Sequence, residues 1–173
     1  DLVRSRGLGD VYKRQLQNVL NTDKKLDAYD SGRIYYYLGD YQKAYLALEE
    51  AKGKGGVDSY LYLGKAYAAT GDYNYASSVY SNYLSKQGPD AEIYNQLGLC
   101  ELAKKDYQKA LEAFQAGKQI EGNSLMQTLS FNEIVAYEYL QDYQKAAVLL
   151  KAYLQNYPDD QAAIREQQFL STR

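Results

Sequence analysis

The chain has 173 residues, of which 46% are apolar and 24% are charged, with a formal net charge of −2; this suits one folded domain or a repeat array and excludes wholesale disorder. It contains no His and a single Cys, Cys100, which excludes His-based catalysis, an internal disulfide and a Cys-based zinc site. The acidic balance disfavours nucleic acid as a partner, and no apolar run is long enough to span a membrane.

The first 15 residues resemble a translated sequencing adaptor, and we expect residues 1–15 to be an artefact or a disordered tail. Without their four basic and two acidic residues, the remaining 16 positive and 20 negative residues give residues 16–173 a net charge of −4. The chain starts at Asp1 and its only Met is Met126, so we interpret it as a fragment. We expect the domain to be cytoplasmic by default; the alternative is export or lipid anchoring through a missing N-terminus.

One five-residue motif recurs four times in the remaining chain. Its copies end at alanines that are 32, 34 and 36 residues apart, at Asp40–Ala44, Asp72–Ala76, Asp106–Ala110 and Asp142–Ala146. Each Asp follows a helical stretch and suits the N-cap of a second helix. Each Ala allows two helices to approach closely, where a bulkier residue would overpack them. Four copies at this spacing indicate a repeated pair of helices.

The predicted helices follow in chain order. Residues 16–22 are interpreted as the end of an earlier helix. The helix pairs are predicted at residues 25–38 with 41–53, 58–70 with 73–86, 91–104 with 107–119, and 125–140 with 143–156, and a last helix at 160–171. Turn residues close the units at 53–56, 88–90, 121–123 and 158–160.

This pattern resembles the tetratricopeptide repeat family. The second unit matches the family pattern best, with Tyr60, Leu63, Gly64, Tyr67, Ala76 and Tyr80. Three units depart from it: Ser31 stands where Leu is usual, Glu101 where Tyr is usual, and Ile134 where a small Gly is usual. The resemblance covers residues 25–158. It implies that small residues maintain the helix packing, namely Gly32, Ala44, Gly64, Ala76, Gly98, Ala110 and Ala146.

The resemblance implies an all-α fold, a right-handed α-α superhelix of about four helix-turn-helix repeats with a C-terminal capping helix. The domain is then residues 16–173, with repeats at about 25–56, 57–90, 91–124 and 125–158 and the capping helix at 160–171. Stacked repeats of this kind form both a continuous core and an extended concave surface.

In that family the first helix of each pair lines the concave groove. Carried over residue by residue, the resemblance gives a partner-binding groove of Tyr29, Arg33, Tyr36, Tyr62, Lys65, Asn95, Leu99, Phe131 and Tyr139, with Tyr37 and Asp58 on the same helix faces. Tyr and Arg are residues that anchor protein interfaces. The Lys and Asn set with which chaperone-binding members clamp a terminal carboxylate is absent, because Tyr29, Arg33 and Tyr62 occupy its positions. The tyrosines could instead fill gaps between helices, and Arg33 and Lys65 could be ordinary solvated charges or could favour an acidic peptide.

Other motifs point to no chemistry. The Gly-rich stretch at residues 52–56 lacks the preceding strand and the Lys-Ser/Thr of a phosphate loop, and Cys100 lies in an apolar helical run and is expected in the core. We therefore expect no metal, no cofactor and no enzymatic activity.

The sequence predicts a bacterial protein-interaction scaffold that binds a partner protein or peptide in its groove. We expect a monomer or weak homo-oligomer with no nucleic-acid partner and no membrane insertion by this segment. The alternative is a regulatory or sensory module that binds a signalling peptide or small ligand and is attached to a missing N-terminal domain. An RNA-binding helical repeat is disfavoured by the net charge of residues 16–173.

Overall fold

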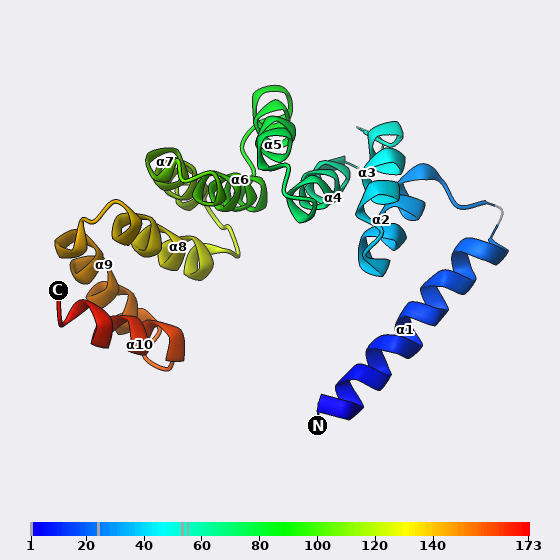
Figure 1. The fold of residues 1–173 in the computed structure, drawn as a ribbon. Helices are drawn as coiled ribbons and strands as arrows, with labels where there is room; N and C mark the ends of the chain where they lie inside the picture. Colours follow the sequence, from blue (N-terminus) through cyan, green and yellow to red (C-terminus); the bar gives the residue numbers. More distant parts are fainter. Residues whose placement is uncertain (1, 24, 53, 55) are drawn as a thin grey trace. The chain divides into compact units, whose positions relative to one another are not determined.

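The chain is all-α in a computed structural model that describes residues 2–23, 25–52, 54 and 56–173. Among these residues there are ten α-helices and no strand (Figure 1). The chain divides into two compact units, Asp1–Val79 and Tyr80–Arg173, and the boundary falls inside α5, Tyr73–Gln87. Within the described residues, no helix is both long and apolar enough to cross a membrane.

The first unit consists of four helices and the beginning of α5. Its helices are α1 (Leu2–Thr22), α2 (Ala28–Leu38), α3 (Tyr41–Glu50) and α4 (Gly56–Ala69). Helix α2 packs against α1, α3 and α4, and α3 packs against α4. Buried apolar side chains between these helices include Leu48 of α3 and Leu63 of α4. This packing places one face of α2 beside one face of α4.

The second unit continues from α5 with five further helices. They are α6 (Ala91–Ala103), α7 (Tyr107–Lys118), α8 (Met126–Tyr139), α9 (Tyr143–Asn156) and α10 (Gln161–Leu170). Each of these helices packs against the next one along the chain, from α6 to α10. One buried cluster joins α7 and α8 around Phe114 and Leu129, and another joins α8, α9 and α10 around Ile134, Leu150 and Leu170. Helix α10 therefore covers the apolar side of the last helix pair.

The helices predicted between residues 25 and 171 are confirmed, and every observed end lies within three residues of its predicted position. Helix α1 starts at Leu2 and runs through residue 16, where the sequence places the start of the domain. The division into 1–15 and 16–173, and the repeat boundaries, stay predictions. In the predicted turn at residues 53–56, Gly53 and Gly55 lie outside the described residues.

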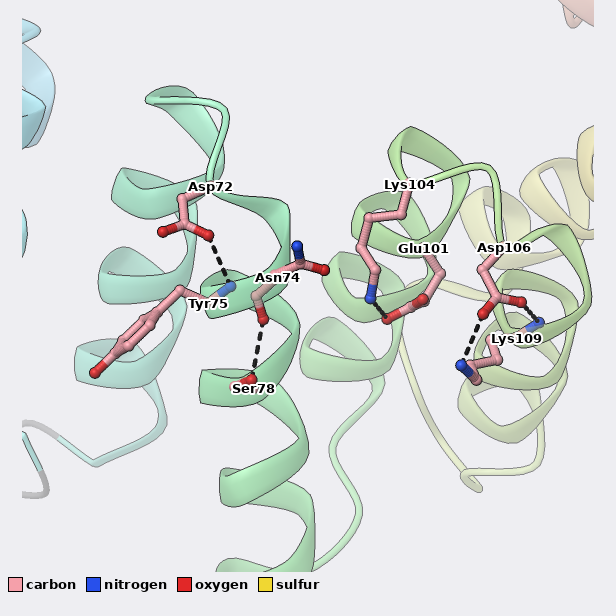
Figure 2. Close-up of polar contacts among 8 residues, drawn as sticks. All are labelled: Asp72, Asn74, Tyr75, Ser78, Glu101, Lys104, Asp106 and Lys109. Carbon is pink, nitrogen blue, oxygen red and sulfur yellow. Dashed lines mark hydrogen bonds and ion pairs between the residues drawn. The ribbon is translucent and has the colours of Figure 1, made fainter.

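The Asp of each repeated motif caps the second helix of a pair. The Oδ1 atom of Asp72 accepts a hydrogen bond from the backbone N–H of Tyr75 at 3.0 Å, and Asp106 accepts one from Lys109 at 3.4 Å (Figure 2). Asp40 and Asp142 make the same bond three residues ahead. An N-cap carboxylate satisfies a backbone donor that the helix itself leaves unpaired. The motif that recurs in the sequence therefore marks the start of the second helix in each pair.

The residue before each capping Asp has left-handed backbone geometry. The φ angles are 83° at Gly39, 87° at Gly71, 64° at Lys105 and 62° at Gln141. In all four turns the N–H of the following Asp bonds to the carbonyl five residues back, and the left-handed residue bonds three residues back. This pair of bonds is the Schellman ending of a helix. All four turns thus have the same backbone form, although only two use Gly.

Candidate functional site

The structure brings together the five groove residues predicted in the first unit. Helix α2 supplies Tyr29, Arg33 and Tyr36, and α4 supplies Tyr62 and Lys65. The Arg33 Cζ atom lies 5.3 Å from the centroid of the Tyr29 ring and 5.2 Å from that of Tyr62. The Lys65 Nζ atom lies 6.0 Å from the Tyr62 ring centroid. These distances are typical of cation–π contacts, so the two basic residues and the rings form one cluster, here called the α2–α4 face.

Further contacts between tyrosine rings and hydroxyls hold the α2–α4 face together. The Tyr36 ring lies 5.5 Å from the Tyr62 ring at a steep angle, and the Tyr37 ring lies 5.8 Å from it. The hydroxyls of Tyr37 and Tyr62 are hydrogen-bonded at 2.6 Å, and the Tyr29 hydroxyl donates to Asp58 Oδ2 at 3.3 Å. Edge-to-face contacts of this kind hold aromatic rings in fixed orientations.

The ionisation of the α2–α4 face follows from its burial. Desolvation, assisted by the hydrogen bond to Tyr37, raises the pKa of Tyr62 to about 12. Desolvation also raises the pKa of Tyr29 and of Tyr36. These phenols therefore stay protonated at neutral pH and can donate hydrogen bonds.

Arg33 has no acidic partner among the described residues. Its Nε atom is buried without a hydrogen-bond partner, and Arg33 makes no ion pair with any other residue in the described part of the chain. On the side of α1, Arg33 and Tyr37 also line a pocket of about 210 Å³ together with Tyr12 and Leu16. A guanidinium that stacks on rings but lacks a carboxylate is well suited to bind an anionic group.

The groove residues predicted in the second unit have separate surroundings. Asn95 of α6 is buried and its Oδ1 atom accepts a hydrogen bond from Asn132 of α8 at 2.9 Å. Leu99 is 40% exposed. The Phe131 ring packs against the core and lies 5.7 Å from the Tyr153 ring.

Tyr139 is 53% exposed and stacks on Tyr107 of α7 at 4.9 Å. Among the described residues, no polar or aromatic contact links Asn95, Leu99, Phe131 and Tyr139 to one another. The second unit therefore offers separate candidate positions, whereas the first unit offers a connected cluster.

The predicted packing residues are all buried. They are Gly32, Ala44, Gly64, Ala76, Gly98, Ala110 and Ala146. A Cβ atom at Gly32 would lie 2.5 Å from Leu48 Cγ, and one at Gly98 would collide with the Phe114 ring. At the corresponding place in the last pair, Ile134 is buried in one cluster with Ala146 and Leu150. Close approach of the helices therefore accounts for the small residues in the first and third pairs.

Comparison with known families gives the same repeat. Two family models described as tetratricopeptide repeat match residues 61–124 and 131–160, which together are more than half of the chain. The chain belongs to the tetratricopeptide repeat (TPR) family. Among curated proteins, no sequence matches it.

Solved structures share the TPR fold. The crystal structure of MamA superimposes with a TM-score of 0.72 at 21% identity, over 83% of this chain and 78% of that one. TTC0263, a thermophilic TPR protein of Thermus thermophilus, has a TM-score of 0.72 at 16% identity, over 99% and 95%. The second TPR domain of human RPAP3, solved in complex with an HSP70 peptide, has a TM-score of 0.57 at 16% identity, over 64% and 90%. At these identities the likeness concerns the fold.

The structure also shows two features that the sequence pattern did not predict. Tyr107 stacks on Tyr139, but it belongs to a second helix of a pair, whereas the groove was assigned to first helices. Glu101 is 5% exposed, and the replacement of the usual Tyr by Glu at this position does not by itself predict that burial. Burial raises the pKa of Cys100 to about 12, so its thiol stays protonated. Within the described residues, no cluster of three or more His, Cys, Asp or Glu could hold a metal ion.

Proposed function

We propose that this TPR chain is a non-enzymatic interaction scaffold and that its α2–α4 face binds a segment of a partner protein. The observation that supports this most is the Arg33 guanidinium, which lies over the Tyr29 and Tyr62 rings and makes no ion pair among the described residues. Rigid aromatic rings around an arginine are characteristic of the residues that contribute most to protein interfaces. A repeat scaffold presents such residues on an extended surface.

The chemistry of the α2–α4 face favours a partner segment with an acidic side chain. Arg33 and Lys65 are positively charged, and the neighbouring phenols are protonated donors at neutral pH. A carboxylate on the partner would receive charge-assisted hydrogen bonds from the arginine, and apolar side chains beside it would cover the rings. A structural neighbour, the second TPR domain of RPAP3, binds an HSP70 peptide, which supports a peptide as the partner here.

The test is a peptide-display selection on the purified 173-residue chain, followed by affinity measurements on the recovered peptides. We expect enrichment of acidic residues and an affinity that falls as salt is added, because salt screens exposed charges. Replacing Arg33 or Tyr62 by Ala is expected to weaken binding at least about tenfold, as at interface hot spots. Tyr73→Ala, at the exposed start of α5, is the matched control and should bind like the unchanged chain.

The proposal fails if both the Arg33→Ala and Tyr62→Ala variants keep full affinity while their circular dichroism shows an intact fold. It also fails if the recovered peptides are basic or bind independently of salt.

A further inference from the structure

A pocket of about 310 Å³ in the second unit lies apart from the groove residues. It is lined by Ser81, Tyr94, Leu97, Glu101, Lys109, Glu112, Ala113 and Ala116. Tyr94, Leu97 and Glu101 follow one another at three and four residues along α6 and therefore share one face of that helix. Asn95 and Leu99 lie on another face. The pocket is thus separate from the groove positions of α6.

Three tyrosines show what occupies this place in the other repeats. Tyr35, Tyr67, Glu101 and Tyr137 each precede the alanine of their repeat by nine residues. The Tyr67 ring is stacked at 4.5 Å on Tyr45 and lies 4.3 Å from Tyr75. Its hydroxyl donates a hydrogen bond to Glu49 at 3.4 Å. In the first unit, the corresponding space is therefore filled by a phenol ring with a polar partner at its tip.

The same space is emptied on two sides in the third repeat. Glu101 of the third repeat replaces the ring. Ser81 belongs to the second repeat and stands five residues after its alanine, Ala76, where the first and third repeats have Glu49 and Gln115. In the last repeat Gln115 donates to the Tyr137 hydroxyl at 3.3 Å. A small serine in place of these long side chains cannot fill the space that the missing ring leaves. The loss of two large side chains accounts for the pocket.

Glu101 gives this pocket an unused hydrogen-bond acceptor. Its Oε1 atom pairs with Lys104 Nζ at 2.8 Å (Figure 2), whereas its Oε2 atom is buried and has no partner. Lys109, which also lines the pocket, is already paired with Asp106 at 2.7 Å. A buried acceptor without a donor is unfavourable. A ligand with a neutral donor would satisfy it, since Lys104 already balances the charge of Glu101.

We propose that this pocket binds a phenol: a planar aromatic ring whose hydroxyl donates to Glu101 Oε2. Tyr94, Leu97 and Ala113 provide the apolar walls for the ring. The phenol is either the tyrosine side chain of a partner protein or a free small molecule. In both cases it takes the place that a tyrosine of the chain itself takes in the other repeats.

The test is a titration of the ¹⁵N-labelled 173-residue chain with p-cresol, followed by NMR. Saturable amide shifts are expected at residues 81, 94, 97, 101, 109 and 113, with a dissociation constant of about 1 mM for so small a ligand. Toluene, which has the ring but no hydroxyl, should bind about three- to tenfold more weakly because it cannot use the acceptor. The Glu101→Tyr variant restores the residue of the other repeats and should abolish the shifts, whereas Glu121→Gln, at an exposed residue of the same unit outside this pocket, should leave them unchanged.

N-acetyl-tyrosinamide separates the two sources. Binding as tight as that of p-cresol identifies a partner's tyrosine, and its exclusion while p-cresol binds identifies a free phenol. Equal binding of toluene, tighter binding of n-butylamine, or shifts that persist in a folded Glu101→Tyr variant would each overturn the proposal. If Glu101→Tyr does not fold, the comparison of p-cresol with toluene on the unchanged chain still decides it.

Discussion

At the scale of single residues, the many tyrosines of this chain fall into two groups with different surroundings. Tyr67 lies between two other rings and fills space between helices. Tyr62 instead contacts Arg33 and Lys65 on the α2–α4 face. A tyrosine suits both places because its ring is apolar while its hydroxyl bonds to a polar partner. The residue type alone therefore does not distinguish a packing tyrosine from a binding one.

A residue-scale prediction concerns Gly98, whose Cβ position is occupied by the Phe114 ring. Gly98→Ala should lower the free energy of unfolding by about 1–3 kcal/mol, because a methyl group there overpacks a buried contact. Urea denaturation measures this change. In a Phe114→Leu background, which makes room beside residue 98, the same substitution should cost clearly less. An equal cost in both backgrounds would show that this contact does not limit the packing of α6 on α7.

At the scale of helices and turns, the sequence predicted the elements well and the turn geometry only in part. The motif that ends at Ala110 predicted a helix pair because a capping Asp and a buried Ala are both local requirements of that packing. The left-handed turn before Asp106 gives no such signal, since Lys105 occupies a position that usually takes Gly. Its conformation depends on the two backbone hydrogen bonds that close the turn.

These turns give two predictions of opposite sign for the free energy of unfolding. Lys105→Gly and Gln141→Gly should each raise the free energy of unfolding by about 0.5–1 kcal/mol, because relief of the left-handed strain exceeds the added freedom of the unfolded chain. Gly39→Ala and Gly71→Ala, in the equivalent turns, should lower it. Thermal and urea unfolding of the four variants provide the measurement. Glycine variants that destabilise the chain would mean that the side chains of Lys105 and Gln141 stabilise their turns.

The candidate site was less predictable than the helices. The family resemblance placed Phe131 with the groove residues. The structure adds that its ring lies beside Tyr153, a contact that a position on a helix does not fix. The cluster of Arg33 with Tyr29 and Tyr62 depends on contacts between two helices. The departure at Glu101 was visible in the sequence, but the pocket also requires Ser81 from a different helix.

At the scale of the whole molecule, stability should depend on pH through the last helices. Burial, followed by the nearby carboxylate of Glu166, raises the pKa of Glu138 to about 7, and one Glu138 oxygen is buried without a partner. A carboxyl with a raised pKa in the folded state favours folding most when it is protonated. The free energy of unfolding should therefore fall as pH rises from the ordinary Glu value to about 7, and stay level above it.

The measurement is urea denaturation at intervals between about pH 5 and 8, where a chain without His has few other groups that titrate. We expect a fall of about 1–2 kcal/mol, less than the full pKa shift implies because Glu138 is partly exposed. Glu138→Gln should flatten this part of the curve, whereas the exposed Glu112→Gln should not. At lower pH the sign reverses at Asp160, because the Tyr153 hydroxyl and backbone donors lower its pKa and protonation removes that contribution. A slope unchanged by Glu138→Gln would contradict the assignment.

The exposure of Leu99 has an optical consequence. The chain contains 21 Tyr and no Trp, so its intrinsic fluorescence has no indole component. A Trp in place of Leu99, on the accessible side of α6, would be the single indole emitter of the molecule. Its emission would change with the polarity of whatever covers α6, and the chain would then report an encounter on that helix without an attached dye.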